Sequence, residues 1–293
     1  MAIILLWMPQ RMPGKWLSVI WLLPLIMVRP SPPEKGTFSA TFLDVGQGLS
    51  VVVQTTSHAL LFDTGARFSD RFNAVDSVVL PFLRAQGITR IDTLVLSHAD
   101  NDHAGGANRL YRKFPIGQTL ASFQPNDLHL PWYECEAGQT WVWDDVVFKI
   151  LHPSPDWQGA ENERSCVLAV GDKTNRLLLT GDIGRKAEQW LLALNPPELA
   201  AKILQVPHHG SRTSSTAGFI DAVQPDYAVF TVGYRNRFGF PKPDIVMRYH
   251  HRGITTLRTD RTGAIRYRPD HKPGATPLSL YRELHRHIWQ SVE

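Results

Sequence analysis

The sequence predicts an α/β fold, a sandwich in which β-strands and helices alternate along the chain. Many short apolar runs rich in Val, Ile and Leu recur, and segments with helical spacing lie between them. Several of the apolar runs also end in His or Asp. Polar residues repeated at strand ends are typical of a functional site built at one edge of a sheet.

The expected elements follow these runs in order. Apolar runs predict strands at 38–43, 49–54, 58–62, 91–96, 141–151, 166–170, 176–179, 203–206 and 227–231, and a hairpin formed by 254–258 and 264–268. The spacing of apolar residues predicts helices at 75–86, 184–194 and 278–289. We expect the last helix to dock its apolar stripe on the core.

The N-terminal residues differ from the rest of the chain. Residues 16–28 are apolar but interrupted by Pro24, and they fall short of the ~20 residues that span a bilayer. We interpret 1–36 as a membrane-proximal apolar segment with a Pro-rich linker, either the end of a larger membrane region or a weak anchor. Arg11 and Lys15 on the cytoplasmic side would place the following domain outside. The main domain is predicted at 37–270, and 271–293 is predicted to form an amphipathic tail helix.

Charge and cysteine content narrow the classes of function. The net charge is +4, but residues 235–293 carry 12 Lys and Arg against 5 Asp and Glu. A basic C-terminal third suits a polyanion such as nucleic acid, although charge alone favours a solvated positive surface. Cys135 and Cys166 are too few for a disulfide framework or a thiolate zinc site, and we expect them to be isolated packing residues.

The segment from Leu94 to Gly106 carries the strongest chemical signal. After an apolar run it places four metal-binding side chains within six residues: His98, Asp100, Asp102 and His103. Buried carboxylates and imidazoles without partners are costly, and bound metal ions remove that cost. The pattern therefore predicts a metal site at the end of a buried strand.

Three further apolar runs end in similar residues. One ends at Asp182, a second at His208, His209 and Ser211, and a third at Asp63. Each alone is a weak signal, because an Asp near a Gly after a strand is usually a turn. Their joint occurrence indicates one site assembled from several strand ends.

Together these motifs resemble the metallo-β-lactamase superfamily, and more narrowly its ComEC members, which are DNA-uptake channel proteins. The matching segments are 42–48, 97–106, 162–167, 208–211 and 258–260, and the resemblance covers about 37–267. It implies a four-layer αββα sandwich with a binuclear site where the two sheets meet.

Carried over position by position, the resemblance implies the metal ligands. His98 and Asp100 would hold one ion, Asp102 and His103 the other, Asp182 would bridge them, and His208 or His209 would complete the shell. Which histidine of that pair is the ligand stays open at this point.

The resemblance also implies supporting roles. The other histidine of the pair and Ser211 would face the phosphate, and Asp63 would orient a ligand histidine. Asp44 and Gln47 would shape the adjacent loop, although a purely structural role is equally open for them.

Several positions depart from the family pattern. Asp100 replaces a histidine, and the loop 161–165 lacks a third histidine, which makes the site richer in oxygen and favours Mn²⁺ over Zn²⁺. An acidic residue is common in the family where Leu49 stands, and a histidine where Phe240 stands.

These features predict metal-dependent phosphodiester hydrolysis. Two divalent ions, Mn²⁺ or Zn²⁺, would activate water and stabilise charge on the phosphoryl oxygens, and Asp102 or His209 would protonate the leaving oxygen. Phosphate or DNA contacts are expected from Arg235, Asn236 and Arg237.

The resemblance implies a nuclease that degrades one DNA strand while the other enters the channel. It places the domain on the periplasmic side of the inner membrane, with DNA, the membrane and other channel domains as partners. Two alternatives stay open. A small-molecule metallo-hydrolase is disfavoured by the basic C-terminal third, whereas a weakly active or inactive DNA-docking domain is favoured by Leu49 and Phe240.

Overall fold

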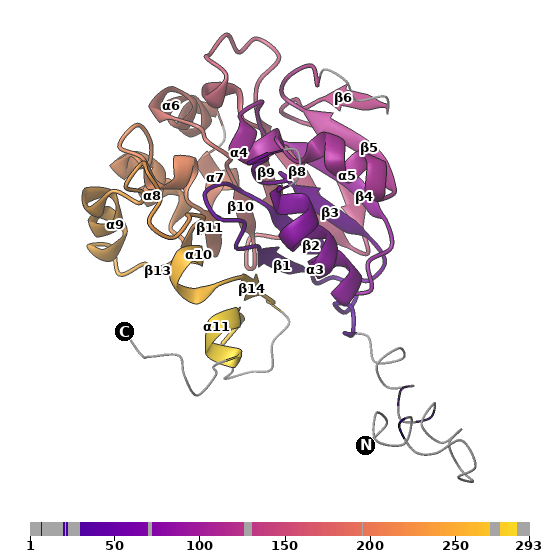
Figure 1. Cartoon of the computed structure of the whole chain (residues 1–293). Helices are drawn as coiled ribbons and strands as arrows, with labels where there is room; N and C mark the ends of the chain where they lie inside the picture. The colour runs from indigo at the N-terminus through magenta and orange to yellow at the C-terminus, as the bar shows by residue number, and fades with distance from the viewer. Residues whose placement is uncertain are drawn as a thin grey trace.

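Two β-sheets lie face to face in the computed structural model, and helices cover the outer face of each (Figure 1). The structure describes residues 7, 20, 22, 30–69, 72–125, 131–194, 196–269 and 276–285. The predicted four-layer αββα sandwich is thus confirmed. Most of the predicted 1–36 segment, and the tail beyond residue 285, lie outside the described residues. In the part that is described, no helix has the length and apolar character needed to cross a membrane.

The first sheet has eight strands in the order β15-β14-β1-β2-β3-β4-β5-β6. Strands β3 to β6 run parallel to one another, and the other neighbours are antiparallel. Their bounds are β1 (Ser39–Phe42), β2 (Val51–Gln54), β3 (Ala59–Phe62), β4 (Ile91–Leu96), β5 (Ile116–Ala121), β6 (Trp132–Glu134), β14 (Ile265–Tyr267) and β15 (Leu278–Leu280).

The second sheet has seven strands in the order β13-β12-β11-β10-β9-β8-β7. Strands β10 to β13 are parallel, whereas β7, β8, β9 and β10 pair antiparallel. Their bounds are β7 (Thr140–Trp143), β8 (Val146–His152), β9 (Val167–Val170), β10 (Leu177–Leu179), β11 (Ile203–Gln205), β12 (Tyr227–Phe230) and β13 (Thr255–Arg258).

Helices on each side close separate apolar layers. The first sheet is covered by a π-helical turn (Val75–Val79) that continues into α3 (Leu80–Ala85), by α4 (Asn101–Ala104) and by α5 (Ala107–Lys113). The second sheet is covered by α6 (Arg185–Leu194), α7 (Pro196–Leu199), α8 (Ala217–Val223) and α9 (Pro243–His250). The remaining short helices are α10 (Thr259–Thr262) and α11 (Tyr281–Leu284), with 3₁₀ turns at Asn162–Arg164 and Pro207–Gly210.

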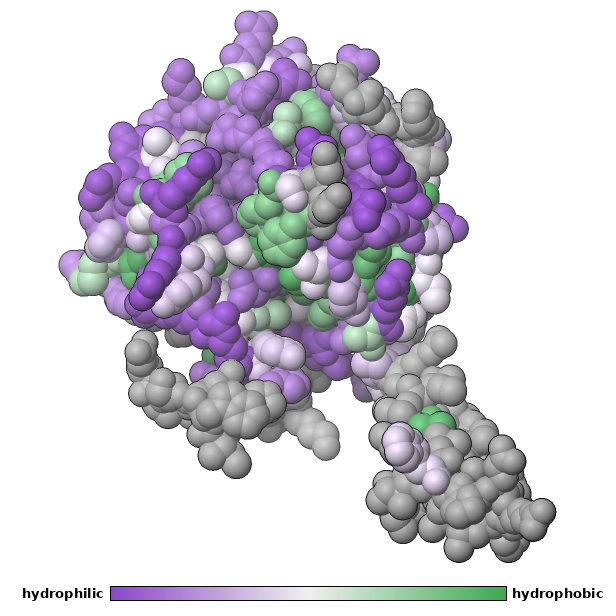
Figure 2. All heavy atoms as spheres, in the orientation of Figure 1, coloured by the Kyte–Doolittle hydropathy of each residue, from purple (hydrophilic) through white to green (hydrophobic). Residues whose placement is uncertain are grey.

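The main core fills the space between the sheets. It is built from alternate residues of the inner faces, including Phe42, Phe62, Phe148 and Leu168. Figure 2 shows a mostly hydrophilic outer surface on one face, interrupted by an apolar patch near its centre.

Three local predictions need correction. Residues 141–151 form two strands, because Asp144 and Asp145 adopt left-handed conformations and close a two-residue hairpin turn. The predicted hairpin of 254–258 with 264–268 is wrong, since β13 and β14 belong to different sheets. Leu278–Leu280 form an edge strand on β14 rather than the start of a helix, and only Tyr281–Leu284 are helical.

The expectation of isolated cysteines is also wrong. Cys135 follows β6 in the first sheet, Cys166 precedes β9 in the second, and a disulfide joins them. Both are fully buried at the edge where the sheets meet. Local sequence could not reveal this pair, because the sandwich alone brings positions 31 residues apart into contact.

Candidate metal centre

The chain topology brings the predicted ligands to one edge of the sandwich. In the first sheet, parallel strands β3 and β4 end just before Asp63 and His98. In the second, β10 and β11 run parallel and end before Asp182 and the His208–His209 pair. The carboxyl ends of parallel strands share an edge, so the four segments converge between the sheets.

Helix α4 adds the remaining residues of the Asp-rich motif. Asp100 precedes its first residue, while Asp102 and His103 lie on it. The short helix turns the chain directly after β4, so His98 and His103 become neighbours with ring centroids 4.1 Å apart.

Asp63 holds His103 in one orientation. The Asp63 carboxylate is fully buried and accepts hydrogen bonds from the Ser97 amide at 2.7 Å and the Ser97 hydroxyl at 2.6 Å. It also lies 2.7 Å from His103 Nδ1, which therefore carries the proton. The predicted orienting role of Asp63 matches this geometry.

The other two buried histidines are held in the same way. His209 Nδ1 lies 2.7 Å from the Thr231 carbonyl oxygen, which can only accept a hydrogen bond. His98 Nδ1 lies 3.1 Å from the Ser97 hydroxyl, whose own proton goes to Asp63. In each case these partners occupy Nδ1, which leaves Nε2 as the ring atom that faces the cluster and would bind a metal ion.

These Nε2 atoms converge on Asp182. His103 Nε2 lies 3.1 Å and His209 Nε2 3.6 Å from Asp182 Oδ1, and the two nitrogens are 3.2 Å apart. Asp102 Oδ2 is 3.4 Å from His209 Nε2. The arrangement therefore concentrates lone pairs and carboxylate charge in one buried space.

Charge in this space governs the protonation of its members. Burial opposes the charged form of His103, but the Asp182 and Asp63 carboxylates outweigh it and raise the pKa of His103 well above its ordinary value. Burial likewise opposes ionisation of Asp182, yet His103 and His209 hold the pKa of that carboxyl well below its usual range. The buried carboxylates of the cluster therefore need positive charge beside them to remain ionised.

Divalent metal ions fit this demand. His98 Nε2 and Asp182 Oδ1 are buried atoms without a hydrogen-bond partner, although such atoms are nearly always satisfied. Ligand atoms of His98, His103 and Asp182 lie within 4.8 Å of one another, and so do those of Asp102, His103 and His209. Imidazole nitrogen with carboxylate oxygen is a donor set for zinc, manganese or iron.

The geometry distinguishes the two histidines of the pair. His209 is buried and belongs to the converging cluster, whereas the side chain of His208 is 25% exposed and its Nε2 lies 3.7 Å from Asp182 Oδ2. Both adopt left-handed backbone conformations, with φ of 50° and 54°. That turn directs two consecutive side chains to the same site.

Other predicted residues lie at the border of the site or outside it. Asp100 Oδ2 is 3.3 Å from His98 Nε2. The Ser211 hydroxyl accepts a hydrogen bond from the Thr213 hydroxyl within its own turn. Asp44 is paired with Arg282 at 3.0 Å, away from the ligand atoms.

Gln47 belongs to a loop that braces α4. Its Oε1 accepts a hydrogen bond from the Gly233 amide, and a side chain at Gly48 would place its Cβ 2.4 Å from the Asp102 carbonyl oxygen. Gly48 also has a φ of 141°. The glycine is therefore required for close backbone approach, a role that sequence reasoning had not assigned to it.

An aromatic and basic loop, residues 234–242, lies beside the histidine pair. The cations of Arg235, Arg237 and Lys242 stack over Tyr234, Phe238 and Phe240 respectively, at 4.8–5.2 Å from the ring centroids. The Phe240 ring lies 6.0 Å from that of His208 and 6.4 Å from that of His209. The side-chain amide of Asn236 bonds to Gly233 and Phe240 within the loop, which leaves it no free donor for a phosphate.

The fold and this cluster define a metallo-β-lactamase domain, and comparison of sequences agrees. The Metallo-beta-lactamase superfamily model matches residues 43–233, so the chain belongs to that superfamily. Within it the predicted ComEC resemblance is confirmed. The chain is 38% identical over 270 residues to Competence protein ComA of Neisseria gonorrhoeae and 35% identical over 233 residues to Recombination protein 2 of Haemophilus influenzae.

The chain corresponds to only part of these relatives. The alignments cover 91% and 80% of this chain but 37% and 29% of the relatives' lengths. Among solved structures, the metallo hydrolase Igni18 of Ignicoccus hospitalis superposes with a TM-score of 0.50 at 12% identity, over 80% of this chain and 100% of that one. YhfI of Bacillus subtilis superposes with a TM-score of 0.51 at 11% identity, over 79% of this chain and 99% of that one. These two support the fold.

Proposed function

We propose that this domain is a metal-dependent phosphodiesterase that hydrolyses DNA, acting as the nuclease domain of a DNA-uptake channel on the strand that is not imported. The observation that carries the proposal is the convergence of three imidazole Nε2 atoms on Asp182 beside a basic, aromatic loop. The first feature suits metal ions, and the second suits a polyanion with planar bases.

Two divalent ions, Mn²⁺ or Zn²⁺, are the proposed cofactors. His98 and Asp100 would hold the first ion. The second ion would be held by Asp102, His103 and His209, and Asp182 would bind both ions. Bound ions would supply the positive charge that acidifies a water molecule and neutralises the phosphoryl oxygens. The oxygen-rich set around His98 favours the harder ion.

The chain itself positions ligands and phosphate. Asp63 and the Thr231 carbonyl fix two imidazoles, which limits motion within the cluster. His208 borders the open side, where its imidazole would be placed to pass a proton to the leaving oxygen. Arg235 and Arg237 extend the positive surface along which a phosphate chain would run.

The proposed location is the periplasmic side of the inner membrane, with other channel domains as partners. Two relatives carry names from competence and recombination. The Cys135–Cys166 disulfide supports the location, since disulfides persist in oxidising compartments and are rare in the cytosol.

A cleavage assay tests the proposal. The purified chain is stripped of metal and given single- or double-stranded DNA with Mn²⁺, Zn²⁺ or Mg²⁺. We expect degradation that depends on the metal and is abolished by Asp182→Asn. Asp92→Asn is the matched control, because Asp92 bonds to the Ala59 amide in the same sheet, away from the cluster. Cleavage that persists in Asp182→Asn would contradict the mechanism.

A second candidate is a DNA-docking domain without activity. The observation that favours it is Phe240, whose ring packs against the histidine pair where the family commonly has a histidine. DNA binding without cleavage in any metal, together with cleavage gained by Phe240→His, would establish this alternative.

A further inference from the structure

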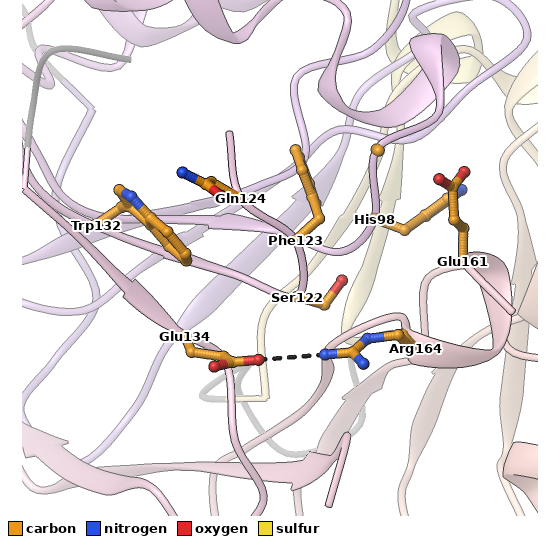
Figure 3. A pocket seen from close by; sticks show the side chains of 9 residues that line it. His98, Ser122, Phe123, Gln124, Trp132, Glu134, Glu161 and Arg164 are labelled. Carbon is orange, nitrogen blue, oxygen red and sulfur yellow. Dashed lines mark hydrogen bonds and ion pairs between the residues drawn. The ribbon is translucent and has the colours of Figure 1, made fainter. Parts of the chain in front are cut away.

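A separate pocket opens beside His98 and includes no residue of the basic loop (Figure 3). Its volume is about 360 Å³, at the lower end of sites for small organic ligands. Its lining comes from the first sheet, at β6 and just after β4 and β5, and from the turn around 161–164: His98, Ala99, Ser122, Phe123, Gln124, Trp132, Glu134, Glu161 and Arg164. In the view of Figure 3, Phe123 lies between Trp132 and His98.

The pocket is continuous with the metal centre through a row of rings. The centroids of His98 and His103 are 4.1 Å apart, those of His103 and His209 5.2 Å, and those of His209 and Phe240 6.4 Å. His98 lines this pocket and Phe240 belongs to the basic loop, so both features adjoin the histidine cluster.

Two half-buried aromatic side chains make the pocket suitable for a planar ring. Phe123 follows β5 and Trp132 begins β6, and both pack on the apolar layer beneath while remaining accessible from the pocket. Aromatic faces bind planar rings by stacking, and they do so for any base.

The charge of the pocket selects against phosphate. Glu134 and Glu161 outnumber Arg164, which is itself paired with Glu134 at 3.2 Å. A phosphate would meet net negative charge here, whereas the loop at 234–242 offers three cations. The same Glu–Arg pair and Gln124 provide both acceptors and donors, which match the edge of a neutral base.

The walls are held in place before any ligand arrives. Cys135, next to Glu134, is joined by the disulfide to Cys166, two residues after Arg164. The Cys166 amide also donates to the Ser97 carbonyl beside His98. A pre-formed pocket avoids the ordering cost that weakens binding to mobile surfaces.

We propose that this pocket binds one unpaired nucleobase, and so selects single-stranded or locally opened DNA as the substrate. The inference rests on the proposed function, since it assigns a base subsite to the same centre. Base pairs inside a duplex are stacked and shielded, so a base must leave the stack to enter, which costs unpairing and unstacking free energy. Trp132 and Phe123 are then specificity residues, separate from the metal ligands.

Equilibrium binding to the metal-free full chain tests the proposal. The probes are a fluorescein-labelled oligothymidylate and an abasic strand of equal length, compared by fluorescence anisotropy. We expect Trp132→Ala to weaken oligothymidylate binding by about 5- to 150-fold and to leave abasic binding unchanged. Trp132→Phe should retain most of the affinity. Tyr133→Ala is the control, since Tyr133 is the next residue on β6 and does not line the pocket.

Each outcome separates this proposal from the nuclease proposal. Equal weakening of both probes by Trp132→Ala, or no weakening, would overturn the base pocket even if the wild type cleaves DNA. Loss of affinity in Trp132→Phe as large as in Trp132→Ala would also overturn it, because stacking would not be responsible. Base-dependent binding in a wild type that cleaves nothing would support the pocket and refute the nuclease.

Discussion

The disulfide between Cys135 and Cys166 gives the most quantitative prediction. The cross-link closes a loop between positions 31 residues apart and joins the two sheets where the metal centre and the base pocket meet. In the chain-entropy description, a loop of that length makes the unfolded state less favourable by about 4 kcal/mol. Reduction of the native protein should therefore lower the free energy of unfolding by about that amount.

Guanidinium unfolding curves with and without a thiol-free reductant measure this loss. Reduction keeps both sulfur atoms in their buried places and removes only the cross-link, so the midpoint should fall. The slope should rise, because the unfolded chain without the cross-link is less compact and exposes more surface. The Cys135→Ala/Cys166→Ala variant should lose further stability, since both side chains are fully buried and their removal leaves a cavity.

Two results would refute this reasoning. Mass spectrometry after alkylation in denaturant without reductant should find no free thiol, and two free thiols would show that the pair is not formed. Identical unfolding curves in oxidised and reduced protein would show that the cross-link leaves the stability unchanged.

Three further predictions concern the site and its surroundings. Asp63→Asn keeps a residue that tolerates the left-handed backbone but removes an acceptor for His103, so chelator competition should find metal affinity reduced by about 10- to 100-fold. Mn²⁺ at about 100-fold above its dissociation constant should stabilise the wild type by about 3 kcal/mol and Asp182→Asn much less, as thermal unfolding would report. Burial lowers the pKa of His152 to about 4, so its neutral form stabilises the fold fully above the unfolded-state pKa of about 6.5. That contribution is lost as pH falls towards 4, by about 3 kcal/mol, and the loss should be much smaller in His152→Gln.

The fold class and the ligand cluster were predictable because their signals are local. His98 lies in the turn after β4, and Asp102 and His103 lie on the helix that follows, so their order alone brings them together. Asp182 and the histidine pair follow the apolar parallel strands β10 and β11. Because the carboxyl ends of parallel strands share an edge, these residues come to lie close together. Choosing His209 over His208 required the left-handed turn, which the sequence does not specify.

Sheet membership was not predictable from local pattern. The runs that became β13 and β14 have the alternation expected of a hairpin, yet α10 carries the chain from one sheet to the other between them. Strands β5 and β6 were missed, and with them Phe123 and Trp132. Their aromatic character was visible in the sequence, but their place beside His98 depends on the parallel pairing of β4 with β5 and of β5 with β6.

The two flanks of the metal centre differ in a way that argues against a general small-molecule hydrolase. Such an enzyme needs one enclosed pocket over its ions, whereas here a mildly acidic aromatic pocket lies at His98 and a cationic aromatic loop lies at Phe240. A ligand that satisfies both must alternate neutral planar groups with negative charge along an extended chain. A single strand of nucleic acid has that alternation, and a lactone or a thioester does not. The contrast in charge between the pocket and the loop is therefore the structural reason for the proposed polymeric substrate.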